Sequence, residues 1–183
     1  MNSDEIRFCN LLTEIHQAAL KIGASSDPRK WREAAATLQN GQKLPTKKSG
    51  GDCFIEDESG NMAPCERKSH VGKSPKGAYT GLSWKPTWTK QWDYIVHKKL
   101  GVCKYQFFDV FDPDTGELTG TWRMDTKILL ELMKPRFKNT WEKLAEKKRL
   151  NNDDDDPRPS WSIGKRDILA NSVQVFKIGE ASK

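Results

Sequence analysis

The chain has 183 residues, enough for one domain with a buried core, and 31% of them are charged. Seven tryptophans, seven phenylalanines and three tyrosines argue against a disordered chain, and the net charge of +6 is common among nucleic-acid-binding proteins. No run of about eighteen apolar residues is present to span a membrane, and the N-terminus lacks the features of a signal peptide. We therefore expect an intracellular, cytoplasmic protein.

Two helices are predicted at the N-terminus. Residues 4–22 carry apolar side chains at helical spacing, with Ser3 as the N-cap and Gly23 as the stop. The second helix lies within residues 27–41, where Asp-Pro and Asn-Gly pairs mark its two ends. Its predicted apolar face consists of Trp31, Ala34, Ala35 and Leu38.

A β-hairpin is predicted next, with strands at residues 50–57 and 63–68 and a glycine-containing turn between them. This pairing makes Cys53 and Cys65 neighbours. We favour two small apolar strand residues over a disulfide, because cytosolic thiols usually stay reduced. The four cysteines include no Cys-x-x-Cys pair, which argues against a zinc site.

The hairpin carries the strongest functional pattern of the chain. Antiparallel pairing places Asp52 opposite Glu66, and side-chain alternation puts Glu66 and Lys68 on one face. Two carboxylates and an ammonium then converge beside Gly50 and Gly51, which is the chemistry needed to hold Mg²⁺ and activate water against a phosphodiester. Asp52 and Glu66 are the predicted metal ligands, and Lys68 stabilises developing charge or assists deprotonation. The alternative is a turn aspartate followed by a solvated strand face.

The rest of the chain predicts an α+β fold with a mixed central sheet. Residues 69–90 are rich in Gly, Pro, Lys and Ser and are predicted to be irregular or an edge strand. The remaining predicted elements are helical turns at 91–99, strands at 104–111 and 117–124, a short helix that starts at Asp125 or Thr126 and ends at Pro135, a helix at 140–150, an acidic loop at 151–159 and a strand at 173–178.

The Asp52, Glu66-x-Lys68 pattern resembles the PD-(D/E)xK nuclease superfamily, in particular type II restriction endonucleases of the small homodimeric Pvu type. The order of elements over residues 38–178 is loosely similar too. The resemblance implies a restriction-endonuclease-like core, with a central mixed sheet flanked by helices, and a single endonuclease domain over residues 1–183. It further implies Mg²⁺-dependent cleavage of double-stranded DNA at a short specific site by a homodimer. Residues 1–41 are then the expected dimerisation part, and residues 42–183 form the catalytic and DNA-recognition core.

The same resemblance implies where DNA is contacted. Residues 75–80 take the place of the family's base-reading strand, and residues 83–85 lie near the place of a histidine cluster that this chain lacks. Asp155 and Asp156 take the place of a loop that enters the major groove, where a carboxylate accepts a hydrogen bond from cytosine N4; an exposed acidic loop is the alternative. The predicted DNA-contacting residues are Lys43, Lys48, Lys73, Lys76, Tyr79, Thr80, Ser83, Trp84, Lys85, Asp155 and Asp156.

The chain departs from the family pattern in two respects. Gly51 stands where the family usually has proline, and no acidic residue lies shortly upstream of Asp52. A third metal-linked carboxylate must therefore come from elsewhere, and Glu14 on the first predicted helix is one candidate. Two other functions stay open. One is a repair or junction-resolving nuclease with the same core, and the other is a non-catalytic nucleic-acid-binding protein whose carboxylates are structural.

Overall fold

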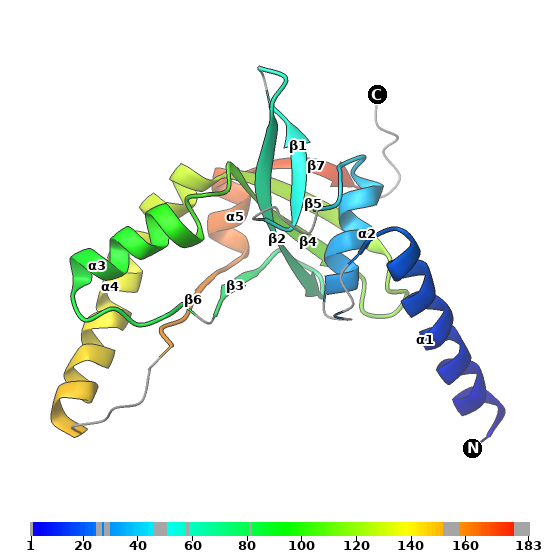
Figure 1. The fold of residues 1–183 in the computed structure, drawn as a ribbon, viewed down its shortest axis with the longest axis horizontal. Coiled ribbons are helices and arrows are strands. Elements are labelled where there is room, and N and C mark those ends of the chain that lie inside the picture. The colour runs from blue at the N-terminus through cyan, green and yellow to red at the C-terminus, as the bar shows by residue number, and fades with distance from the viewer. Residues whose placement is uncertain are drawn as a thin grey trace.

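The computed structural model describes residues 2–24, 27, 30–45, 51–57, 59–80, 82–151 and 158–177. It is a mixed α/β fold in which a curled five-stranded mixed sheet is flanked by helices, in agreement with the predicted α+β class (Figure 1). Lys48, Asp155 and Asp156, three of the predicted DNA contacts, lie outside the described residues.

The predicted hairpin forms one edge of the sheet. In it β1 (Cys53–Glu56) pairs antiparallel with β2 (Met62–Val71), and Cys53 lies opposite Cys65. Both cysteines are buried free thiols, as expected for small apolar strand residues. The other strands of the sheet, in spatial order from β2, are β4 (Tyr105–Phe111), β5 (Leu118–Asp125) and β7 (Val173–Lys177). Strands β2 and β4 are parallel, and the remaining neighbours are antiparallel.

A separate two-stranded ribbon packs against β2 and β4 of this sheet. It pairs β3 (Gly77–Tyr79) with β6 (Trp161–Ile163), and the rings of Tyr79 and Trp161 stack with centroids 5.7 Å apart. A Cβ atom at Gly77 would lie only 2.6 Å from Phe108 Cε1, so a glycine is needed for the ribbon to pack this closely on β4. The sequence indicated an edge strand in this region but not β6.

The longest helix differs from the prediction. Two short helices separated at Pro135 were expected, but α4 (Thr126–Asn151) continues through Pro135 as one helix. Its buried residues Leu129, Met133 and Phe137 lie on one helical face that packs into the main core, and this burial outweighs the local penalty of the proline.

The other helical elements are α1 (Ser3–Lys21), α2 (Trp31–Gln39), α3 (Trp88–Tyr94), the π-helix η2 (Ile95–Lys99) and α5 (Lys165–Asn171).

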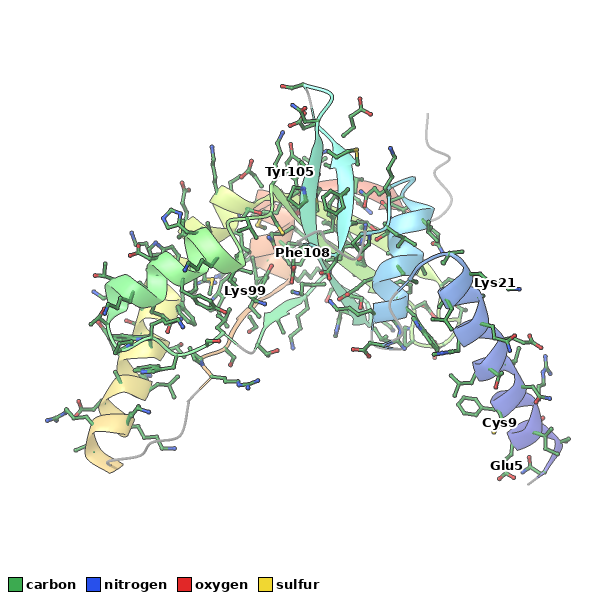
Figure 2. All side chains as sticks on the ribbon, in the orientation of Figure 1. Glu5, Cys9, Lys21, Lys99, Tyr105 and Phe108 are labelled. Carbon is green, nitrogen blue, oxygen red and sulfur yellow. The ribbon has the colours of Figure 1, made fainter. Side chains whose placement is uncertain are left out.

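The molecule has two arms that diverge from the sheet (Figure 1). One arm is made by α3 and α4, and the other is α1, along which Glu5, Cys9 and Lys21 are labelled in Figure 2. The main core lies between the sheet and the first arm, whereas Ala19 is the buried residue of α1. The α1 N-cap is Asn2 rather than the expected Ser3, since its side chain accepts from the backbone of residues 4 and 5. Within the described residues, no helix has the length and apolar character required to span a membrane.

Candidate active site

Asp52 lies at the start of the hairpin, beside the strand that carries Glu66 and Lys68. Its backbone N–H donates to the Cys65 carbonyl at 2.7 Å, and its Oδ2 accepts from the Arg67 backbone N–H at 3.0 Å. The register of β1 and β2, continued by one residue, sets Asp52 opposite Glu66 as predicted. The carboxylate is therefore fixed at the edge of β2 by main-chain contacts.

Gly51 has a structural reason at the position where proline is usual in the resembled family. Its φ is +110°, a conformation that residues with a side chain rarely adopt. A Cβ atom here would also lie 2.9 Å from the Cys65 carbonyl oxygen. The chain therefore reaches Asp52 through a turn that requires glycine.

Glu66 and Lys68 form an ion pair on the same face of β2. The Lys68 ammonium lies 5.4 Å from the centroid of the Tyr79 ring, and the Tyr79 hydroxyl donates to Gln106 Oε1 at 3.1 Å. Gln106 Nε2 in turn donates to Thr126 Oγ1 at 3.1 Å. Burial and the Glu66 charge raise the pKa of Tyr79 well above its ordinary value. Tyr79 is only 3% exposed and packs against Lys68 from the core side. Its side chain is therefore not positioned for the predicted DNA contact.

Helix α2 adds two charged groups that the sequence analysis did not assign to the site. Lys30 Nζ lies 2.9 Å from Asp52 Oδ1 and 2.8 Å from Glu33 Oε2. Glu33 thus joins Asp52 and Glu66 as a third acid of the site. The candidate Glu14 is exposed on α1, and no contact between it and Asp52 is found among the described residues.

Glu33 was missed because the buried face of α2 was predicted incorrectly. Ala36 and Thr37 are fully buried, whereas Leu38, expected on the apolar face, is 47% exposed. Glu33 lies three and four positions before the two buried residues, so it faces the sheet. A small-residue face containing one acid is the only sequence signal for this placement, and the larger side chains of the helix conceal it.

The electrostatics around Glu33 reflect its burial. Burial and the Asp52 charge raise the pKa of Glu33, and Lys30 offsets part of this effect. Burial lowers the pKa of Lys30, but the contacts with Glu33 and Asp52 outweigh it and the net shift is upward. Glu33 Oε2 is buried, and among the described residues its close polar contact is the Lys30 ammonium at 2.8 Å.

A pocket of about 210 Å³ opens beside these groups, and its charged lining consists of Lys30, Glu33 and Asp52. Carboxylate oxygens are the ligands that Mg²⁺ and Ca²⁺ prefer, and the buried Glu33 Oε2 already holds a positive charge, the Lys30 ammonium. In the described part of the chain, no three acidic, histidine or cysteine side chains already form a metal-binding group. The acids are held instead by the ammonium groups of Lys30 and Lys68.

A buried ion pair lies behind the site, on the opposite face of β2. Arg67 donates to Asp109 through Nε at 2.9 Å and through Nη2 at 2.5 Å, and both side chains are fully buried. Arg67 Nη1 donates to Gln42 Oε1 at 2.5 Å, and Thr121 Oγ1 donates to Asp109 Oδ1 at 2.9 Å. The residue between Glu66 and Lys68 is therefore tied to β4, to β5 and to the segment after α2.

The predicted DNA contacts fall into two groups. Lys43, Lys73, Lys76 and Thr80 are exposed, and Lys43 bridges to Phe54 next to the hairpin. Their exposure is compatible with phosphate or base contacts.

The segment Ser83–Lys85 instead attaches the chain to the α3 and α4 arm. Trp84 stacks on Trp141 with centroids 5.3 Å apart, and the Lys85 ammonium lies 4.8 Å from the centre of the Tyr94 ring. The Ser83 carbonyl accepts from Gln91 Nε2 at 3.2 Å. These contacts give Trp84 a packing role in this arm.

Comparison with protein-family models and with curated proteins gave no match.

Proposed function

We propose that the protein is a Mg²⁺-dependent endonuclease that hydrolyses double-stranded DNA, and that it belongs to the type II restriction enzymes. The observation that carries this proposal is the grouping of Asp52, Glu66 and Lys68 at one edge of β2. Glu33 adds a third acid at the same place. The order of α2, the β1–β2 hairpin and a β4 strand parallel to β2 supports a restriction-endonuclease-like core.

Asp52 and Glu66 would hold the cation, with Glu33 as the additional oxygen donor. When bound, Mg²⁺ supplies stabilisation of the negative charge that develops during phosphodiester displacement. Lys68 is held over Tyr79 and beside Glu66, so its ammonium is oriented before a substrate arrives. Its role is to contact the reacting phosphate group or the attacking water and to stabilise charge there.

The β3–β6 ribbon is the surface that we propose for base contacts. Its outward residues Ala78, Thr80, Ser160 and Ser162 are exposed and alternate with buried ones. A pocket of about 400 Å³ is formed by these four residues with Trp161 and with Arg136 and Thr140 of α4. A two-stranded ribbon fits the major groove, and hydroxyl and guanidinium groups can read base edges there.

Helix α1 is the surface that we propose for homodimerisation. It presents large apolar side chains to solvent, among them Phe8, which is 65% exposed, and Ile15, which is 49% exposed. A second copy packed antiparallel would bring the acidic first turn, with Asp4 and Glu5, beside Lys21 in the last turn of its partner. Two-fold symmetry would give one active centre for each DNA strand.

The test is incubation of the purified protein with plasmid DNA and Mg²⁺. Discrete bands support a restriction enzyme, a smear supports a nonspecific nuclease, and absence of cutting supports a non-catalytic nucleic-acid-binding protein. Preference for branched over plain duplex would favour a junction-resolving enzyme.

Lys68→Ala is expected to abolish cleavage while DNA binding, measured in Ca²⁺ by gel shift, stays within about threefold of wild type. The matched control is Lys165→Ala, an exposed lysine at the start of α5. Undiminished cutting by Lys68→Ala would remove Lys68 from the mechanism.

A further inference from the structure

Lys30 occupies an unusual position for a lysine at the end of a helix. It is the N-cap residue of α2, yet its ammonium lies between two carboxylates, 2.9 Å from Asp52 Oδ1 and 2.8 Å from Glu33 Oε2. Both acids are mostly buried, with side chains 16% and 12% exposed, whereas the Lys30 side chain is 41% exposed. Lys30 can therefore move into solvent without opening the core.

A cation held by Asp52 and Glu33 would take the same place between their oxygens as the ammonium does. The cation and the Lys30 ammonium cannot both lie between these carboxylates, because two positive charges at contact distance repel each other strongly where little water screens them. The pocket that Lys30, Glu33 and Asp52 line gives the ammonium space to leave. As it leaves, the ammonium would exchange its contacts with the two carboxylates for contacts with water.

We propose that Lys30 is a built-in counter-ion that fills the divalent-cation position of the metal-free protein and is displaced when the cation binds. This inference rests on the proposed metal site and adds how its occupancy is controlled. Binding is then an exchange of one ammonium for one divalent ion, and Lys30 sets the cation concentration at which the site fills.

Lys68 has a different role, although it is also paired with an acid. Among the described acids it contacts Glu66, and it lies over the buried Tyr79 ring with its side chain 19% exposed. These contacts hold Lys68 in place when the cation enters. The two lysines thus differ in what surrounds them, so only Lys30 is expected to compete with the metal.

The experiment measures Ca²⁺ binding to the full chain by isothermal titration calorimetry, without DNA. Lys30→Met is expected to tighten the Ca²⁺ dissociation constant by about tenfold or more, equivalent to ~1.4 kcal/mol. The matched control is Arg32→Met, which removes the same charge from an exposed position of α2 and is expected to change the constant less than about threefold. Lys30→Arg keeps the competing charge and is expected to stay near wild type. Thermal unfolding in EDTA establishes that each variant is folded.

Equal affinities for Lys30→Met and Arg32→Met would overturn the proposal, because the effect would then be general electrostatics. Weaker binding by Lys30→Met would also overturn it and would make Lys30 a residue that positions the acids. Asp52→Asn is expected to abolish the binding, and Ca²⁺ affinity unchanged by it would refute both this inference and the proposed metal site. Tightening in Lys30→Met without DNA cleavage by wild type would support the exchange and refute the nuclease.

Discussion

Asp109→Asn would test how strongly the buried ion pair behind the site holds β2. The substitution keeps the shape of the side chain and removes its charge, which leaves the Arg67 guanidinium buried without a counter-ion. Burial lowers the pKa of Arg67, yet the contact with Asp109 outweighs that effect, so the arginine stays charged in the wild type. Breaking a buried pair from one side destabilises proteins by about 3–5 kcal/mol. A domain of ordinary stability has roughly 5–15 kcal/mol in total, so the loss is a large fraction of it.

The double variant Arg67→Met with Asp109→Leu separates the pair from its surroundings. It removes both charges and both desolvation penalties, so its stability is expected to return to within about 2 kcal/mol of wild type. The remaining loss comes from Gln42 and Thr121, whose hydrogen bonds at 2.5 and 2.9 Å then have no partner.

Urea unfolding followed by tryptophan fluorescence gives the free energy of unfolding of the wild type, of Asp109→Asn and of the double variant. The exposed pair of Arg149 and Glu146 on α4 provides the control, because Glu146→Gln is expected to lower stability by less than about 1 kcal/mol. A loss of less than about 1 kcal/mol in Asp109→Asn would contradict the expected cost of a buried arginine without its counter-ion. A double variant no more stable than Asp109→Asn would contradict it equally.

Three further outcomes are expected. Ile15→Arg on the exposed side of α1 should convert the proposed homodimer to a folded monomer in light scattering, and a monomeric wild type would contradict the proposed interface. Pro135→Ala should stabilise α4 by up to about 3 kcal/mol in urea unfolding, and a destabilised variant would mean that the proline shapes α4 to fit the core. Arg136 holds the pKa of Asp167 below its ordinary value, so Asp167→Asn should lower stability at pH 7. That difference should shrink as the pH falls below about 3.9, and an equal difference at pH 2 would contradict it.

The hairpin and its charged residues could be predicted because their information is local. The turn fixes the register between β1 and β2, and the register decides which residues oppose one another. The alternation of side chains then puts Glu66 and Lys68 on one face and Arg67 on the other, where it is buried against Asp109. Strands at 104–111 and 117–124 were predicted for the same reason and are found as β4 and β5 within one residue.

The missed features depend on contacts between distant segments. Pro135 interrupts a local helix pattern, but burial of Met133 and Phe137 on either side keeps α4 continuous. Strand β6 has only three residues and is defined by its partner β3 rather than by its own sequence. Glu33 resembles an ordinary polar residue of an amphipathic helix, and only the packing of α2 on the sheet turns it toward Asp52.

The charges of the site account for the different roles of Lys68, which stays in place, and Lys30, which is displaced. Glu33, Asp52 and Glu66, when ionised, carry three negative charges, and Lys30 and Lys68 balance two of them. If Lys68 stays and Lys30 leaves, the residual charge is two negative, which one divalent cation neutralises. If both lysines stayed, the same cation would give the site a net positive charge in a partly buried place, at a cost in free energy. Charge balance therefore favours exchange over addition, and the lysine that leaves is the one attached at the exposed end of α2.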